Sequence, residues 1–248
     1  MFISSDFLGI EYGVDDTIGR FYVDREPPVN NLYWHKKLLY LGREPGWLFI
    51  PLIADLFYRS GITRNQLISD DFVLLMEAIG HLSALEETQQ ATHQQTIDAC
   101  TKLVKGKCKS QTYFSHLTDY INGGTNNPFA QFTMPYKALH RGDYFLFSIC
   151  ALVCTDGLAE KLVKNWFALI GTLLLLDDAE DIKRDQQSGD LNAFVESGMD
   201  KKGVEDILKM VKENLAVIRQ VSRPMARKLD DSLIKLLEIP LINSFLNQ

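Results

Sequence analysis

The feature that most constrains the fold is a succession of helix-length segments separated by helix-breaking stretches. The breakers are rich in Gly, Asn, Ser and Lys and include "RSGITRN", "KGKCKS", "NGGTNNP" and "CTDG". Between them apolar residues recur at helical spacing, and no run alternates apolar and polar residues between hairpin turns. We therefore expect an all-α fold. The expected helices span residues 47–58, 70–105, 111–121, 130–154, 158–187, 203–219 and 225–246.

Length and composition indicate one domain. The chain has 248 residues, of which 46% are hydrophobic, enough to fill one sizeable core. No repeat with a period of 20 to 50 residues is visible, which disfavours a solenoid. We predict a single domain over residues 1–248. Its first 45 residues are expected to form an irregular segment packed on the helices, with one short helix at "NLYWHKKLLYL".

Charge and hydropathy exclude two classes of protein. A formal net charge of -6 argues against a general nucleic-acid binder, which is usually basic. The longest apolar stretches, "WLFIPLIADLF" and "WFALIGTLLLL", are shorter than the ~20 residues of a membrane-spanning helix. The N-terminus has no basic region ahead of an apolar one, so it does not look like a signal peptide. We expect no integral membrane segment and a cytoplasmic location.

The four cysteines do not form a recognisable metal or redox motif. They make no CxxC pair and have no His at zinc-ligand spacing. We expect reduced, ordinary residues. Cys150 and Cys154, four residues apart, would share one helical face, where a free Cys behaves as a small hydrophobe.

The segment "GTLLLLDDAEDIKRDQQSGD", residues 171–190, places carboxylates directly after its most apolar turn. Asp177, Asp181 and Asp185 follow at i, i+4 and i+8, and Asp178 lies three residues before Asp181. Four carboxylates can therefore share one edge of a helix. Like charges at this spacing cost a helix roughly 0.2–0.5 kcal/mol per pair, so the arrangement needs compensation.

Two kinds of compensation are open. Mg²⁺ takes hard oxygen ligands and completes its shell with water and phosphate oxygens, so an acidic stripe at a cavity mouth suits a diphosphate substrate. The alternative is a solvated face on which Glu180 and Arg184 pair at i, i+4 and Lys183 neutralises the rest.

The same segment resembles the second aspartate-rich motif of the class I isoprenoid synthase superfamily. This superfamily covers trans-prenyl diphosphate synthases, squalene and phytoene synthases and class I terpene cyclases. Asp177, Asp178 and Asp181 fill the DDxxD pattern, and with Asp185 they also match the spacing of the metal-binding helix in terpene cyclases and phytoene synthases. The resemblance implies an antiparallel helical bundle of the isoprenoid synthase type around a central cavity. The superfamily also suggests a homodimer.

Two further segments follow in a compatible order. "PYKALHRGDYFLF" resembles the helix that supplies a diphosphate-binding Lys, and Lys137 stands forty residues before Asp177. "EAIGHLSALEETQQ" resembles the helix of the first aspartate-rich motif, with Glu86, Glu87 and Gln90 where the first DDxxD is expected. Competing placements of that motif are Asp70–Asp71 and Asp55.

The sequence departs from the family pattern at several positions. The first motif has no aspartate, and Leu174 stands where a Gln usually precedes the second DDxxD. Ala138 replaces a Thr and Asp190 replaces a Lys. Members of the family bind a diphosphate with an Arg-rich segment. The corresponding segment here is "GREPGW", in which Arg43 is the arginine. These departures argue against ordinary chain elongation with isopentenyl diphosphate.

The resemblance implies a Mg²⁺-dependent enzyme, with Mn²⁺ as the alternative ion, that ionises an allylic prenyl diphosphate as a terpene synthase-like lyase or an atypical prenyltransferase. The implied catalytic residues are Asp177, Asp178 and Asp181. The implied metal ligands are these three with Asp185, Glu86, Glu87 and Gln90. The implied diphosphate-binding residues are Lys137, Arg141, Arg43, Arg184 and Arg227. The implied cavity-lining residues are Phe132, Tyr136, Trp166, Phe167 and Leu174.

Each of these roles has a structural alternative. A Trp–Phe pair on an apolar helix is more often core than a cage for a cation, and "EETQQ" reads equally as solvated surface. Lys137 and Arg141 at i, i+4 can be snorkelling surface residues. For the whole chain, the alternative function is a non-catalytic prenyl-diphosphate-binding or regulatory subunit of the same fold. An unrelated bundle with a solvated acidic stripe is the third possibility.

Overall fold

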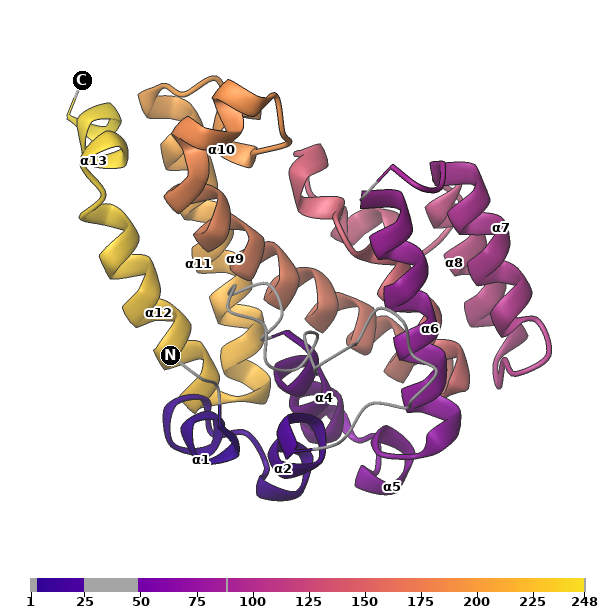
Figure 1. Ribbon diagram of the computed structural model, residues 1–248. Coiled ribbons are helices and arrows are strands. Elements are labelled where there is room, and N and C mark those ends of the chain that lie inside the picture. The colour runs from indigo at the N-terminus through magenta and orange to yellow at the C-terminus, as the bar shows by residue number, and fades with distance from the viewer. Residues whose placement is uncertain (1–3, 25–48, 88, 248) are drawn as a thin grey trace.

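The computed structural model describes residues 4–24, 49–87 and 89–247, and it confirms the all-α prediction for them, since these ranges contain no strand. Figure 1 shows the helices gathered into one unit around the long helix α9. In chain order the elements are α1 Ser5–Phe7, η1 Leu8–Tyr12, α2 Asp16–Asp24, α4 Phe49–Ser60, α5 Arg64–Leu67, α6 Asp70–Glu87, α7 His93–Val104, α8 Gln111–Ile121, η4 Ala130–Phe132, η5 Lys137–His140, η6 Asp143–Ala151, α9 Asp156–Ser188, α10 Ala193–Glu196, α11 Lys201–Val221, α12 Arg223–Leu237 and α13 Pro240–Leu246.

The N-terminal segment is more regular than predicted. The expectation of an irregular stretch is wrong for residues 5–24, which form α1, the π-helical turn η1 and α2. Ser4 caps α1, and Gly13, with φ 67°, provides the left-handed residue at which η1 ends. These elements are tied to the bundle because they pack on α4 and α12. The predicted short helix at residues 31–41 lies outside the described residues.

The predicted helix at 70–105 is in fact two helices. α6 ends at Glu87, and Gln89 follows with φ 59°. α7 then begins with a capping box, in which the Thr92 side chain accepts from Gln95 N and the Gln95 side chain accepts from Thr92 N. The predicted helix at 225–246 is likewise divided, because α13 starts at Pro240, which has no N–H with which to continue α12.

The apolar stretch at 130–154 does not form the predicted α-helix. It forms three 3₁₀ segments, η4, η5 and η6. Pro135 interrupts the helical hydrogen bonding before η5, and Gly142, with φ 89°, turns the chain between η5 and η6. All nine residues of η6 are buried, and α6 packs along it.

α9 organises the rest of the bundle. Thr155 caps its start and Gly189, with φ 80°, ends it after 33 residues, close to the predicted range of 158–187. Its apolar first half is core, where Trp166 and Leu169 are buried, and α4 and α11 pack against the helix. Among the described residues, none of the helices is both long enough and apolar enough to cross a membrane.

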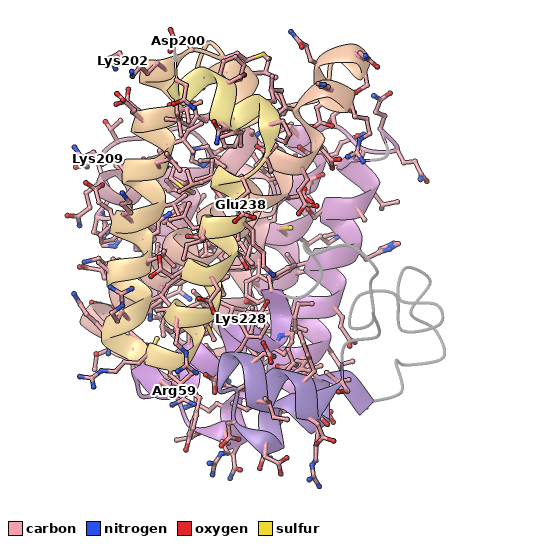
Figure 2. The ribbon with its side chains drawn as sticks, turned by 90° about the vertical axis from the view of Figure 1, so that its left-hand side faces the viewer. Arg59, Asp200, Lys202, Lys209, Lys228 and Glu238 are labelled. Atoms are coloured by element: carbon pink, nitrogen blue, oxygen red, sulfur yellow. The ribbon has the colours of Figure 1, made fainter. Side chains whose placement is uncertain are left out.

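α11 and α12 cover one side of α9. They lie side by side across the face that Figure 2 turns toward the viewer, and Lys209 of α11 points away from the body there. Lys228 of α12 pairs with Glu11 of η1, which links the C-terminal helices to the N-terminal ones.

Candidate functional site

A pocket of about 990 Å³ lies where segments from five parts of the chain meet. Its wall comes from the end of α6, the start of α7, the end of α8, the segment 123–144, and Asp190 and Leu191 after α9. Three residues predicted from two separate segments, Glu86 from one and Lys137 and Arg141 from the other, line it together. The tertiary fold therefore brings Glu86 and the basic segment at 137–141 to one cavity.

Glu86 is held in a hydrogen-bonded group on one side of the pocket. Its carboxylate accepts from the Tyr144 hydroxyl at 2.6 Å and lies 3.1 Å from Nδ1 of His93. The Tyr144 hydroxyl also contacts His93. Burial and the neighbouring Glu86 raise the pKa of Tyr144, so its hydroxyl stays protonated and donates to the carboxylate. Glu86 thus joins the end of α6 to the start of α7 and to η6.

A second group of the same composition lies on the other side. Asp143 Oδ2 accepts from the Tyr120 hydroxyl at 2.6 Å and lies 2.9 Å from His140 Nδ1. His140 Nε2 lies 2.9 Å from the carbonyl oxygen of Met134. Burial alone would lower the pKa of His140, but the contacts with Asp143 and Met134 outweigh it and raise the pKa. Both ring nitrogens face acceptors, which is the environment of an imidazolium ion.

Arg141 connects the pocket to the aspartate-rich helix. Its Nη2 forms an ion pair with Oδ1 of Asp178, and its Nε donates to the Ala138 carbonyl at 2.9 Å. Asp178 Oδ2 accepts from the backbone N–H of Ala193 at 2.7 Å. Asp178 is fully buried, and burial, only partly opposed by Arg141, raises its pKa to about 6. Both oxygens of Asp178 are therefore used within the protein.

The four predicted metal-binding aspartates do not converge. Asp185 is buried, and its Oδ2 accepts from Asn192 Nδ2 at 2.9 Å. Asp181 is half-buried and forms an ion pair with Arg184 at 2.5 Å. Arg184 also lies 3.4 Å from Asp185, so it pairs with the aspartates and not with Glu180 as the solvated-face alternative expected. Asp177 is half-buried on the same helix.

This arrangement does not fit a Mg²⁺ site as it stands. A magnesium ion needs carboxylate oxygens that are open to it, whereas Asp178 and Asp185 give theirs to N–H donors. Within residues 4–24, 49–87 and 89–247, no group of three or more His, Cys, Asp or Glu side chains is arranged to hold a metal ion. The predicted metal roles, including the Mn²⁺ alternative, stay predictions.

The alternative placements of the first acidic motif lie elsewhere. Asp55 is buried in α4, where it accepts from Asp15 N at 2.8 Å and from Arg59 Nε at 2.6 Å, which is a structural role. Asp70 and Asp71 are exposed in the first turn of α6, at the opposite end from Glu86. Gln90 is exposed after α6, and the side chain of Glu87 is not among the described ones.

The remaining predicted ligand-binding residues are spread over the fold. Lys137 is exposed at the pocket, and Glu196 holds its backbone N–H at 2.6 Å. Arg227 is exposed on α12, which packs against α11, η1 and α9, and Arg43 lies outside the described residues. Neither Arg184 nor Arg227 is part of the pocket wall described above.

The predicted cavity-lining residues pack with the core. Trp166 is buried and stacks on Phe145, with ring centroids 4.7 Å apart, and its Nε1 donates to Asp143 Oδ1 at 3.2 Å. Phe167 is buried and meets Tyr120 edge-on at 5.7 Å. The partly buried side chains packed against the core are Phe132, Tyr136 and Leu174.

Sequence reasoning missed most of the polar groups in the pocket. The missed side chains of the two hydrogen-bonded groups are His93, Tyr120, His140, Asp143 and Tyr144. The string "HRGDY" at 140–144 is a usable signal, because it places four polar side chains shortly after Lys137, with only Ala138 and Leu139 between them. The loop "NGGTNNP" lacks the Lys-Ser/Thr signature of a phosphate loop, yet it supplies Gly123, Gly124 and Thr125 to the wall.

The pocket is therefore a cavity with three basic side chains, Lys137, His140 and Arg141, and two Tyr–His–carboxylate groups on its wall. A cavity of this size suits a small ligand. Its basic side chains suit an anionic group on that ligand. Comparison with protein-family models, with curated proteins and with solved structures found no match to this chain.

Proposed function

We propose that the chain binds an allylic prenyl diphosphate in this pocket, as a non-catalytic binding or regulatory protein of the isoprenoid synthase type. One observation carries the proposal: Lys137 and Arg141, which the sequence predicts to hold a diphosphate, line the same cavity as Glu86. By contrast, the carboxylates of Asp178 and Asp185 accept hydrogen bonds from Ala193 N and Asn192 Nδ2 within the protein. The apolar tail of the ligand would lie against Ile121, Ala130 and Leu191 of the wall.

Arg141 is the expected centre of diphosphate binding. A guanidinium has five N–H donors. In Arg141 the donor on Nε binds the Ala138 carbonyl, and one donor on Nη2 binds the Asp178 carboxylate. The side chain is about a third exposed, so its other donors can reach a ligand in the cavity. A guanidinium fork binds phosphate oxygens in pairs. Lys137 adds a mobile point charge from an exposed position.

Isothermal titration calorimetry with geranyl diphosphate tests the proposal. We expect binding without Mg²⁺, and at least a tenfold weaker affinity for Lys137→Ala, which is about 1.4 kcal/mol. Lys209→Ala is the matched control, because Lys209 is an exposed lysine on the outer face of α11 (Figure 2), and its affinity should equal that of the wild type. Absence of binding, or equal affinities for the two variants, would remove the proposal.

A Mg²⁺-dependent ionising enzyme is the second candidate. It is favoured by Asp177 and Asp181, which lie one helical turn apart and are half-buried. The side chain of Arg184, which pairs with Asp181, is 70% exposed. An exposed ion pair contributes only about 0–1 kcal/mol, so releasing Arg184 from Asp181 costs little.

Two measurements separate the candidates. The enzyme releases pyrophosphate from geranyl diphosphate in the presence of Mg²⁺ and loses this activity in Asp177→Asn/Asp181→Asn, whereas the binding protein releases none. Mg²⁺ together with pyrophosphate should raise the melting temperature of the enzyme far more than either alone. For the binding protein, adding Mg²⁺ should leave the shift produced by pyrophosphate unchanged.

A further inference from the structure

Cys108 and Cys150, which are far apart in sequence, lie next to each other in the fold, with Cys154 nearby. Cys108 lies between α7 and α8, Cys150 lies in η6, and Cys154 follows η6. The Cys108 thiol donates to the Ser110 carbonyl at 3.0 Å and lies beside the Cys150 thiol, and the backbone N–H of Lys109 donates to the Cys150 carbonyl at 2.8 Å. All the cysteines are free thiols. The expectation that Cys150 and Cys154 share a helical face is wrong, because η6 ends at Ala151.

Two features near Cys108 favour its thiolate form, whereas the Ser110 carbonyl, to which its thiol donates at 3.0 Å, favours the thiol. The residue is half-buried and lies between two exposed lysines, Lys107 and Lys109. It immediately precedes the start of α8, where Ser110 Oγ caps the helix by accepting from Tyr113 N at 3.1 Å. Basic neighbours and the positive end of a helix both stabilise a thiolate. The hydrogen bond with Cys150, opposed by burial, lowers the pKa of Cys108 to about 7.

Cys150 has the opposite environment. It is buried, and contact with Cys108 together with burial raises its pKa, so it remains a thiol. A thiolate that is accessible and a protonated thiol in contact with it are the two components of a dithiol redox pair. Within the described residues there is no group of three or more metal-ligating side chains here, which argues against a thiolate metal site.

We propose that Cys108 and Cys150 form a dithiol–disulfide couple, with Cys108 as the attacking thiolate, Cys150 as the resolving thiol and a low-molecular-weight disulfide as the oxidant. Cys108 attacks one sulfur of glutathione disulfide, the S–S bond breaks and one glutathione leaves as thiolate. That thiolate takes the proton of Cys150, whose sulfur then attacks the mixed disulfide and expels the second glutathione. Starting from the Cys108 thiolate, the protein loses two electrons and one proton, and one glutathione disulfide becomes one glutathione thiol and one glutathione thiolate, which takes a proton from water.

The disulfide would connect two parts of the site already described. Cys108 lies in the connection between α7 and α8, and α7 begins with the pocket residue His93. Cys150 lies in η6, which also carries the pocket residues Asp143 and Tyr144. Oxidation therefore cross-links the α7–α8 connection to the element that forms part of the pocket wall. Cys154 is half-buried near the pair but does not take part in the proposed bond.

The test is incubation of the reduced full-length protein with glutathione disulfide, followed by intact mass and non-reducing peptide mapping. We expect the wild type to lose two hydrogens and to give a Cys108–Cys150 linked peptide. Cys150→Ser should instead keep one glutathione on Cys108, and Cys108→Ser should form neither product. Cys154→Ser is the matched control and should behave as the wild type.

A wild-type protein that forms no disulfide, or links Cys108 to Cys154, would overturn the proposal. A second measurement needs no variant: the rate of iodoacetamide alkylation, mapped by peptide, should be half-maximal near pH 7 at Cys108. Cys100 provides the internal reference, because it is fully buried and burial raises its pKa to about 12, so it should not react in the folded protein. A midpoint for Cys108 above pH 8 would also contradict the assignment.

Discussion

The acidic edge of α9 carries aspartates with very different surroundings on its inner and outer sides, which we call the inner face and the outer face. On the inner face, Asp178 and Asp185 are buried and hold the segment after the helix, through the N–H of Ala193 and the amide of Asn192. On the outer face, Asp181 is half-buried and pairs with the exposed Arg184. A DDxxD spacing therefore defines an edge of a helix, whereas the neighbouring segment decides which members of that edge remain open to a ligand.

The largest expected effect comes from breaking the inner face at Asn192. Its Oδ1 caps α10 by accepting from Phe194 N at 3.0 Å, and its Nδ2 donates to Asp185 and to the Asp178 carbonyl. Asn192→Ala removes the cap and leaves a buried carboxylate oxygen without its donor. The expected loss in the free energy of unfolding is about 3 kcal/mol, measured by urea denaturation.

The matched control for that variant is an exposed asparagine. Asn122→Ala removes one hydrogen bond, from Nδ2 to the Thr118 carbonyl, at the end of α8. We expect a loss below about 1 kcal/mol, because water can replace the partner. Equal losses for the two variants would show that Asn192 does not organise the inner face.

The second prediction concerns pH and Asp178. Its pKa is raised to about 6 in the folded protein, above the value of an unfolded chain. The folded state therefore binds this proton more tightly, so the contribution to stability is present below about pH 4 and is lost as the pH rises through about 6. The reference is Asp178→Asn, whose side chain does not titrate. The free energy of unfolding of the wild type minus that of this variant should fall by roughly 2–3 kcal/mol between about pH 4 and pH 7. A difference that stays constant over this range would contradict the burial of a charged Asp178.

A smaller effect is expected at the end of the inner face. Asp185→Ala removes the carboxylate that accepts from Asn192 at 2.9 Å, but Asn192 keeps the Asp178 carbonyl as a partner at 2.7 Å. We expect a loss of about 1–2 kcal/mol in the free energy of unfolding. A gain in stability would mean that the buried charge of Asp185 costs more than its hydrogen bond contributes.

The smallest effect is expected on the outer face, four residues earlier on the same helix. Asp181→Ala breaks an ion pair with an exposed arginine, and such pairs contribute at most about 1 kcal/mol. Since Ala gains helix propensity equally at both positions, the pair of variants compares the two faces directly. We expect the unfolding free energy of Asp181→Ala to lie within about 0.5 kcal/mol of the wild type. A loss as large as that of Asp185→Ala would remove the distinction between the faces.

Sequence patterns predicted the parts of the fold that depend on local signals. The helix at 111–121 has the predicted bounds, and α9 extends the predicted range of 158–187 by two residues at its start and one at its end. Cap signals explain this accuracy, since Thr155 and Gly189 limit α9 whatever packs on it. The errors at 70–105 and 130–154 arose where a weak break, at Thr92 or at Pro135 and Gly142, was read as helix interior.

The sequence by itself determined an all-α chain, the length of α9 and the residue types of its acidic edge, because helix formation follows local periodicity and caps. Only the tertiary structure decided that Asp178 and Asp185 face the segment at Asn192, that Glu86 and Arg141 line one pocket, and that Cys108 meets Cys150. The physical reason is that these contacts join residues far apart in the chain. Burial and hydrogen-bond partners, which set the pKa of Asp178 and of Cys108, exist only after the helices have packed.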